Sequence, residues 1–510
     1  MSYKNWSEGY VDDVDYTSGY YAELNPRNAE LAFLRCGMEF PKVKTACELG
    51  YGQGLSALIH SACSDIDWYG TDFNPQHALR VRQIAQESGC GFKASGDSFA
   101  EYLKRDDLPE FDFIVLHGIW SWVSRGNQQL IKEFISRKLA IGGVVYVSYN
   151  TLPGWSMFNP IRQIMKDNAD ISGATDTLAK IEQSLLFAKD LLASNPIYSA
   201  LSPSVIERFE KISKSERQYL AHEFFNDNWS PVFFADMKRD MQELGLSYAC
   251  TATLPELVDS INISNEQRRF LSQINDRYLR QSVFDFIVNQ QFRRDYWVRG
   301  TKSLTVAEKI DRYRNLSVVL TKNESNIDLN IDGRAGKAPL KKEVYTPIIS
   351  SLSHRGATLV HELETQLNGT LHQNQIFEAI YVLAAKGALC IANSDDDTAK
   401  FRSKGSCLNM EITAKARYGN EFNFLASAVT GGGINVSRFE QLFLRSREQG
   451  LQDPREMAEY AWSCLESNEE KLLVDGKPVN DTEQNIDHLI ERATEFNQLA
   501  LPLLQRLCIA

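Results

Sequence analysis

The sequence predicts an α/β fold built on a doubly wound parallel sheet, because of three observations. A glycine-rich turn near residue 50 joins an apolar segment to a helix-like run. Four further apolar segments follow before residue 150, with helix-like runs between them. Acidic or small polar residues stand where several of these segments end. In such a fold the carboxyl ends of the strands form one edge, and ligands bind along it.

The glycine-rich turn has the sequence ELGYGQG and follows a strand predicted over 43–49. Its three glycines, which allow a tight turn and a close approach to a ligand, are Gly50, Gly52 and Gly54. The helix predicted over 55–62 then offers free N–H groups to a polar or anionic ligand. Dinucleotide sites use G-x-G-x-x-G, and here Leu55 occupies the position of the third glycine. Glu48, at the strand end, can pair with the ammonium group of an amino-acid-like ligand.

The next two predicted strands also end in polar residues. A strand over 66–71 leads into Asp72, and an acid about 20 residues after the glycine turn is placed to bind both ribose hydroxyls of a nucleoside. A strand over 91–94 precedes Asp97 and Ser98, which suit an adenine amino group. The spacing therefore indicates a site for an adenosine-containing ligand.

Two further buried strands are predicted over 111–117 and 139–148, and aromatic residues follow both. The two segments are HGIWSWV and SYNTLPGW. They contribute the acceptor-side candidates His117, Trp120, Trp122, Tyr149, Asn150 and Trp155. A cup of aromatic rings suits a cationic group, which is attracted to the ring faces. For any single tryptophan, packing in the core is the alternative explanation.

Composition excludes several classes of function. A length of 510 residues allows two or three domains. The net charge of −11 disfavours nucleic-acid binding, which needs a basic face. Nine cysteines without a C-x-x-C pair indicate reduced thiols in a cytoplasmic chain and no metal site. No apolar run approaches the ~20 residues of a membrane span, and no targeting segment is evident.

The rest of the chain is predicted to be mainly helical. The first 25 residues are rich in tyrosine and acid, and we expect them to fold over the ligand as a lid. A helix is expected over 28–38. The sheet is expected to close with one more helix and an antiparallel pair of strands, over 233–244, 246–253 and 291–299. Residues 156–230 then form a helical insertion with runs over 179–193 and 203–222, which shapes substrate access and is a candidate dimer contact.

After residue 300 the sequence changes character. Residues 320–342 are polar and predict a linker or an exposed hairpin, and 343–392 resemble a winged-helix module. Few paired basic residues lie on its predicted helices, which favours contact with protein over DNA. Residues 415–510 are predicted to be helical, with a loop at VTGGGI, residues 429–434. The predicted regions are 1–155 (lid and ligand-binding core), 156–230 (helical insertion), 231–300 (closing elements), 301–400 (linker and winged-helix-like module) and 401–510 (C-terminal helices).

The motifs ELGYGQG, HGIWSWV and VSYNTLPGW together resemble the bacterial class I S-adenosylmethionine-dependent methyltransferases that carry a methyltransferase regulatory domain. That group includes the rickettsial-type protein lysine methyltransferases, which modify outer-membrane proteins. The resemblance covers residues 15–155 well and extends more loosely to about 300, whereas the lead-in SGYYAELNPRN departs from the family's pattern. It implies a Rossmann-like, seven-stranded sheet with S-adenosylmethionine as cofactor. The implied cofactor-binding residues are Tyr16, Glu48, Gly50, Gly52, Gly54, Asp72, Phe73, Asp97, Ser98 and His117.

The same resemblance implies N-methylation of a lysine in a surface or outer-membrane protein, with S-adenosylhomocysteine as product. Deprotonating a lysine of pKa about 10.4 at neutral pH costs roughly 4–5 kcal/mol, and apolar surroundings beside a sulfonium reduce that cost. The catalytic candidates are Trp120, Tyr149, Asn150 and His117, and the substrate-binding candidates are Trp120, Trp122, Tyr149 and Trp155. Two alternatives stay open: methylation of a small molecule or surface saccharide, and a non-catalytic regulatory protein that binds the cofactor.

Overall fold

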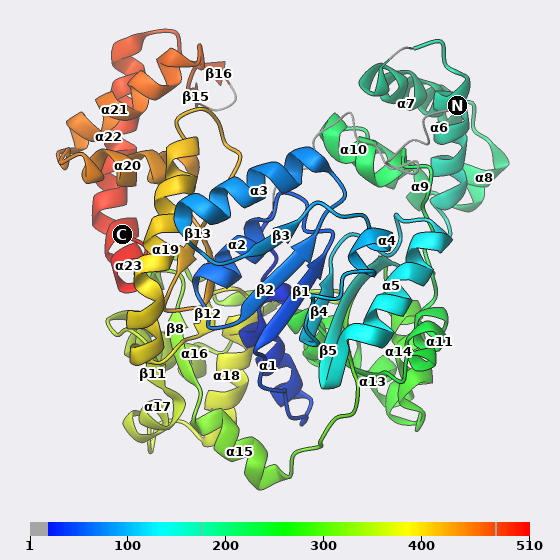
Figure 1. The fold of residues 1–510 in the computed structure, drawn as a ribbon, viewed down its shortest axis with the longest axis horizontal. Coiled ribbons are helices and arrows are strands. Elements are labelled where there is room, and N and C mark those ends of the chain that lie inside the picture. The colour runs from blue at the N-terminus through cyan, green and yellow to red at the C-terminus, as the bar shows by residue number, and fades with distance from the viewer. Residues whose placement is uncertain (1–18, 175, 475–476) are drawn as a thin grey trace.

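A seven-stranded sheet lies at the centre of the computed structural model, which describes residues 19–174, 176–474 and 477–510 (Figure 1). The strand order is β3-β2-β1-β4-β5-β7-β6. The strands are β1 (Thr45–Leu49), β2 (Asp67–Thr71), β3 (Lys93–Ser95), β4 (Phe111–Leu116), β5 (Leu139–Asn150), β6 (Ser247–Thr251) and β7 (Phe292–Val298). Strands β1–β5 are parallel, and β7 runs antiparallel to both neighbours. The predicted fold class, a doubly wound sheet closed by an antiparallel pair, is confirmed.

Helices cover both faces of this sheet. One face carries α1 (Pro26–Arg35), α2 (Leu55–Ala62) and α3 (Pro75–Ser88), and the other carries α4 (Phe99–Tyr102), α5 (Arg125–Lys138) and α11 (Phe234–Glu243). Successive strand residues point to opposite faces, so Ala46 joins the first core and Cys47 the second. Local signals set the helix starts: the Asn74 side chain caps α3, with Pro75 in its first turn.

The predicted helical insertion follows the carboxyl end of β5. Its helices are α6 (Asn159–Ile171), α7 (Thr177–Ala193), α8 (Ile197–Leu201), α9 (Ser204–Ile212) and α10 (Arg217–Phe224). They form a separate group at the upper right of Figure 1 and have an apolar core of their own. The continuous run expected over 203–222 is two helices, because the chain turns between Ile212 and Arg217.

Between the insertion and the last strand, the chain forms the closing elements. These are α11, β6, α12 (Asp259–Asn262), α13 (Asn265–Ser272), α14 (Arg277–Ile287) and β7. The expected helix and both expected strands of this part are present. Within the described ranges, no helix has both the length and the apolar character that crossing a membrane requires.

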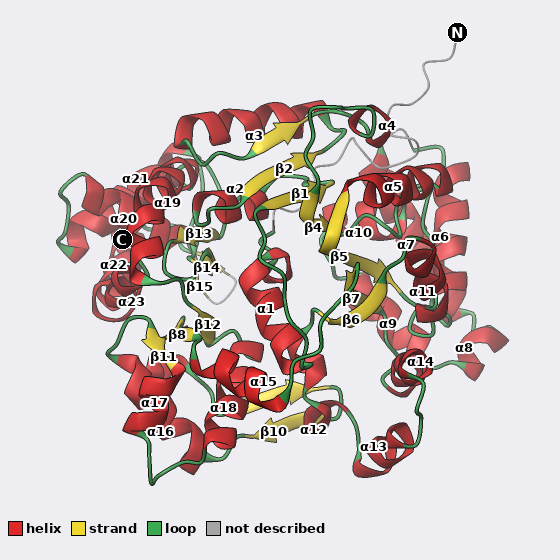
Figure 2. Cartoon of the chain, turned by 60° about the horizontal axis from the view of Figure 1, so that its bottom comes forward, coloured by secondary structure: helices red, strands yellow, loops and turns green. Residues whose placement is uncertain are grey.

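A three-stranded sheet with order β11-β8-β12 follows after residue 300. This part contains α15 (Val306–Arg314), β8 (Ser317–Leu320), β9 (Asn330–Gly333), β10 (Gly336–Pro339), α16 (Lys342–Ser353), β11 (Thr358–Leu359), α17 (Val360–Gln366), α18 (Gln373–Ala385) and β12 (Leu389–Ile391). Strands β9 and β10 form a hairpin, one of the two forms expected for 320–342. The winged-helix assignment stays a prediction. Figure 2 shows α1 between this region and the central sheet.

The C-terminal part is mainly helical and also contains two two-stranded sheets, β13–β14 and β15–β16. It contains α19 (Asp395–Lys415), β13 (Phe424–Ser427), β14 (Gly432–Asn435), α20 (Arg438–Glu448), α21 (Pro454–Ser467), β15 (Leu473–Val474), β16 (Lys477–Pro478), α22 (Thr482–Glu495) and α23 (Leu501–Arg506). The loop prediction for 429–434 is wrong at its end, because Gly432–Ile434 pair with β13. A glycine run suits this strand because the Tyr20 ring occupies the space beside it: a Cβ on Gly433 would lie 2.9 Å from Tyr20 Cδ2.

Candidate cofactor and acceptor site

The glycine turn between β1 and α2 takes a conformation that side chains would block. Gly50, Gly52 and Gly54 have φ of +77°, +56° and +71°. A Cβ on Gly50 would also lie 2.2 Å from Ile119 Cδ1. Ile119 belongs to the loop after β4, so the loops after β1 and β4 are packed together at the carboxyl edge of the sheet.

Asp72 connects the end of β2 to the glycine turn. Its carboxylate accepts hydrogen bonds from the backbone N–H of Gly52 at 2.8 Å and of Asn74 at 2.9 Å. The residue is buried, with 7% of its surface exposed. These bonds fix the carboxylate at the position that the sequence assigns to a ribose contact, and the contact itself stays a prediction.

Glu48 is a buried carboxyl group that has no counter-charge among the described residues. It is 4% exposed, and its Oε2 atom has no hydrogen-bond partner among the described residues. Burial and, second, the negative charge of Asp72 raise the pKa of Glu48 to about 8. A buried carboxylate is costly unless it is paired. The position therefore suits a ligand that brings a positive charge, such as an ammonium group.

The remaining cofactor candidates flank this pair of acids. Phe73 follows Asp72 directly and is partly buried. The Asp97 carboxylate accepts a hydrogen bond from Arg105 at 3.3 Å. Ser98 caps α4 in a reciprocal pair with Glu101. Ser98 thus has a structural role already, and Asp97 lies partly exposed beside it. Tyr16 lies outside the described residues.

Tyr21 covers the site from the N-terminal side. Its ring stacks on the His117 ring with centroids 3.6 Å apart, and its backbone N–H donates to Ser56 Oγ at 2.9 Å. Burial, followed by the charge of Glu48, raises the pKa of Tyr21 to about 12. The sequence placed Tyr21 only within a general lid, without this contact.

Side chains of β5 hold His117 and the residue after it in place. Its Nδ1 atom lies 2.8 Å from the Tyr146 hydroxyl, and the next residue, Gly118, donates its N–H to Ser148 Oγ at 2.8 Å. Burial and the nearby Arg294 cation lower the pKa of His117 to about 3. The imidazole is therefore neutral near pH 7 and too weak a base to deprotonate an ammonium group.

The four aromatic residues expected to form a cup are not brought together. Trp120 and Tyr149 are 1% and 0% exposed and lie in the core under α5 and α11. Trp155 lies in the core of the insertion, where its ring is 4.8 Å from that of Trp229. Trp122 lies nearer the site, 6.4 Å from the Phe292 ring. Strand alternation explains the difference: Tyr149 shares the core face of β5 with Val145 and Val147.

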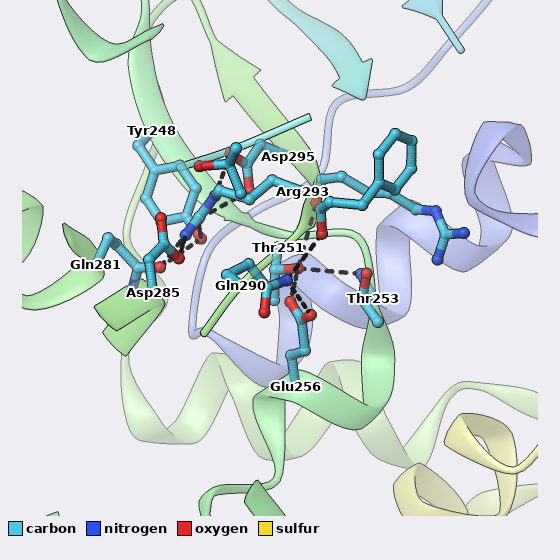
Figure 3. Close-up of polar contacts among 12 residues, drawn as sticks. Tyr248, Thr251, Thr253, Glu256, Gln281, Asp285, Gln290, Arg293 and Asp295 are labelled. Carbon is cyan, nitrogen blue, oxygen red and sulfur yellow. Dashed lines mark hydrogen bonds and ion pairs between the residues drawn. The ribbon is translucent and has the colours of Figure 1, made fainter. Parts of the chain in front are cut away.

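Tyr149 is part of a buried ionic cluster. Its hydroxyl donates to Asp295 at 2.6 Å, and Asp295 pairs with Arg293 at 2.8 Å. Arg293 also pairs with Asp285 at 2.5 Å. Figure 3 shows Arg293 between the two acids, with Tyr248 and Gln281 beside them. This network gives Tyr149 a structural partner and joins β5, β7 and α14.

A different group of side chains lies beside His117. Asn150 shares a strand face with Tyr146 and Ser148, and it pairs in register with Phe292 of β7. The Phe292 ring lies 6.2 Å from His117, and the Nδ2 atom of Asn150 is buried without a partner in the described part of the chain. Period-two alternation in β5 could have identified Tyr146 from the sequence. No local signal links Phe292 to this edge.

Comparisons with known proteins identify relatives along the whole chain. The family model of a predicted methyltransferase regulatory domain matches residues 216–299. The protein sll1526 of Synechocystis sp. is 34% identical over 510 residues, covering 99% of this chain and 100% of the relative. The chain belongs to the family of S-adenosylmethionine-dependent methyltransferases that carry this regulatory domain.

More distant relatives match this chain over nearly its whole length. The protein RP789 of Rickettsia prowazekii is 22% identical, covering 98% of this chain and 92% of the relative. The structure of PKMT2 from Rickettsia typhi in complex with AdoHcy matches with a TM-score of 0.67 and 18% identity, over 94% of this chain and 98% of that one. The likeness shows a common fold that includes the insertion and the C-terminal half.

Proposed function

We propose that this methyltransferase binds S-adenosylmethionine at the glycine turn and transfers its methyl group to the side-chain amine of a protein lysine. The observation that carries the cofactor site is the buried, unpaired Glu48 carboxyl beside Asp72. The cofactor ammonium would supply the missing charge at Glu48. Asp72 would accept the ribose hydroxyls, and Asp97 with Ser98 would flank the adenine.

The acceptor amine would enter beside Tyr21, His117 and Phe292. Transfer forms the N–C bond while the C–S bond breaks; the sulfur keeps the electron pair, and the amine releases one proton to solvent. Placing the two reactants in line is the main task, because the sulfonium is already activated. The neutral His117 ring and the aromatic surroundings favour an uncharged amine. Asn150 would orient it by accepting a hydrogen bond from one of its N–H groups at Oδ1.

The protein acceptor and its surface or outer-membrane location rest on the motif resemblance and the PKMT2 fold likeness. The insertion α6–α10 would shape access, because it leaves the sheet at the same edge as the site. We further propose that the enzyme acts in the cytoplasm and that this insertion supports a homodimer. The fold likeness to PKMT2, over 94% of this chain and 98% of that one, supports a shared architecture that includes this insertion.

The test is transfer of labelled methyl groups from S-adenosylmethionine into a bacterial lysate that is then separated by size. We expect alkali-stable label on protein, recovered as methyllysine after hydrolysis. Asp72→Asn should abolish it, whereas the matched variant Asp67→Asn, at the exposed start of the same strand, should retain it. Label only on small molecules or saccharides would refute the protein acceptor. Cofactor binding without transfer to any fraction would support the non-catalytic alternative.

The acceptor side has a separate test. Phe292→Ala should reduce transfer at least tenfold while the cofactor dissociation constant changes less than twofold. Trp120→Ala should instead lower stability, because the ring is 1% exposed within the core. A Phe292→Ala enzyme with unchanged turnover would place the acceptor elsewhere.

A further inference from the structure

Two cysteines from distant parts of the sequence meet outside the methyl-transfer site. Cys36 directly follows α1 and is exposed, whereas Cys250 lies in β6 and is 2% exposed. Both side chains line the same cavity, and α1 packs against β6. We propose that Cys36 and Cys250 form an oxidation site, at which a peroxide converts the two thiols to a disulfide.

A cavity gives an oxidant access to this pair. It has a volume of about 430 Å³ and is lined by both cysteines, together with Arg277, Arg280 and Arg293. Its wall includes Tyr248, Gln281 and Arg293 of the ionic network in Figure 3. A cavity of this size holds a small molecule. Because Cys250 lines the cavity, a small oxidant inside it can reach this buried residue.

The surroundings of Cys36 favour its thiolate form, which is the reactive species. The Cys250 thiol donates a hydrogen bond to it, and the Lys309, Arg35 and Arg277 cations lie nearby; together these effects lower the pKa of Cys36. Lys309 is held in place by a bond from its Nζ to the Arg35 carbonyl at 2.8 Å. Of the nine cysteines, all within the described part of the chain, Cys36 alone is exposed.

The chemistry balances in two steps. The Cys36 thiolate attacks one peroxide oxygen, so an S–O bond forms, the O–O bond breaks, and the leaving hydroxide takes a proton to become water. Cys36 is then a sulfenic acid. The Cys250 sulfur attacks the Cys36 sulfur, so an S–S bond forms, the S–O bond breaks, and the hydroxyl leaves as water with the Cys250 proton. Two thiols are oxidised and one hydrogen peroxide is reduced to two waters.

The disulfide would fix α1 to the edge strand β6. Helix α1 begins at Pro26, shortly after Tyr21, whose ring stacks on His117. The bond would therefore tie the segment that covers the methyl-transfer site to the closing strands. It would also close a long loop of the unfolded chain, which raises thermal stability.

The test treats the intact protein with a tenfold excess of hydrogen peroxide, blocks the remaining thiols with N-ethylmaleimide and digests the product for mass spectrometry. We expect a peptide cross-linked between Cys36 and Cys250 that dithiothreitol separates, and a thermal midpoint raised by several degrees. Cys508→Ser is the matched control, because that thiol also lies beside an arginine but has no partner cysteine, and it should behave as the wild type.

The Cys250→Ser variant separates the two steps. It should stop at a Cys36 sulfenic acid that dimedone traps, with no rise in the thermal midpoint. If this variant does not fold, the wild type and Cys508→Ser still decide the question. Absence of the Cys36–Cys250 peptide from both proteins after the peroxide treatment would overturn the proposal.

Discussion

Glu48 shows how one residue can link stability, pH and ligand binding. Its carboxyl group is buried, with no counter-charge in the part of the chain that the structure describes, and its pKa is raised from an ordinary value of 4.5 to about 8. The folded protein therefore binds a proton here that the unfolded chain releases above pH 4.5. The sign follows: this residue's contribution to stability is complete below pH 4.5 and is lost as pH rises towards 8.

The first prediction concerns Glu48→Gln in the cofactor-free protein. Between pH 5 and 8 the wild type should lose up to about 1.4 kcal/mol of unfolding free energy per pH unit relative to the variant. The cofactor should bind the variant at least tenfold more weakly, because the ammonium loses its counter-charge. Denaturant titrations and calorimetry measure the two quantities. A variant that is less stable at pH 8 and binds the cofactor normally would contradict both.

At neutral pH the same proton affects binding. A cofactor with an ammonium group stabilises the ionised Glu48, so binding releases the proton.

The second prediction is that cofactor affinity rises up to about tenfold per unit between pH 6 and 8 and levels off above 8. Isothermal titration in buffers of different ionisation enthalpy should show up to one proton released at pH 7. In Glu48→Gln this release and the pH slope should disappear. A pH-independent affinity in the wild type would refute the charge assignment.

At the scale of elements, the hairpin β13–β14 from the C-terminal part of the chain packs against the segment that leads into the candidate site. Gly432 and Gly433 lie against the Tyr20 ring, and the Tyr20 hydroxyl lies 3.1 Å from His60 Nε2 of α2. Asn25, which caps α1, donates to the Gly431 carbonyl at 3.1 Å. The hairpin therefore positions the segment that leads into Tyr21.

The third prediction concerns Gly433→Ala. The new Cβ would lie 2.9 Å from Tyr20 Cδ2, so the ring must move, and we expect a loss of about 1–3 kcal/mol in stability. Gly419→Ala, with open space around the same atom, is the control and should change little. Chemical denaturation gives both values. Adding Tyr20→Ala should remove most of the difference, and full additivity would exclude contact between these residues.

The ionic cluster around Arg293 holds the closing strand β7 against β5 and α14. Its pairs with Asp285 and Asp295 are buried, so removal of the cation leaves two uncompensated acids.

The fourth prediction is that Arg293→Met costs about 3–5 kcal/mol. In contrast, Arg239→Met, which removes an exposed pair with Asp236, should cost less than about 1 kcal/mol. Equal changes in the unfolding midpoints of the two variants would show that the buried cluster stabilises the fold no more than the exposed pair does.

At the scale of the whole molecule, one apolar core joins the sheet to the C-terminal half. It runs without interruption from Leu24 through Ala46 and Val144 to Leu489 and Ile509. Helix α19 packs against α2 and α3, the helices that follow the glycine turn and β2. Residues 301–510 thus cover one face of the ligand-binding unit.

The fifth prediction is that a chain ending at Gly300 does not fold into a stable monomer, because the outer faces of α1, α2 and α3 would be exposed. The intact protein should unfold in one transition, or lose both halves at the same denaturant concentration. Circular dichroism and tryptophan fluorescence would measure this unfolding as the denaturant concentration rises. A soluble, folded 1–300 fragment with normal cofactor affinity would show that the two halves are independent.

The sequence alone determined the class of fold and the places along the chain where the glycine turn and the acids follow the strands. Strand β4 is apolar apart from Asp112, and glycines and acids at fixed spacing follow the ends of β1, β2 and β3, so local patterns are sufficient. Which aromatic rings face the site depended on the tertiary structure. Tyr149 turns into the core because strand alternation and the partner Asp295 hold it there, and no sequence window contains both residues.

Contacts between segments that are distant in the sequence also explain the other features that sequence analysis missed. The packing of Tyr20 against Gly432 and Gly433 and the contact of Phe292 with His117 join segments more than one hundred residues apart in the chain. Local propensity cannot report which distant ring fills the space beside a glycine. The sequence by itself determined the class of fold and the chemistry of the cofactor loops, because those depend on spacing. Only the tertiary structure decided the acceptor side, the buried ionic cluster and the Cys36–Cys250 pair, because those depend on packing between distant elements.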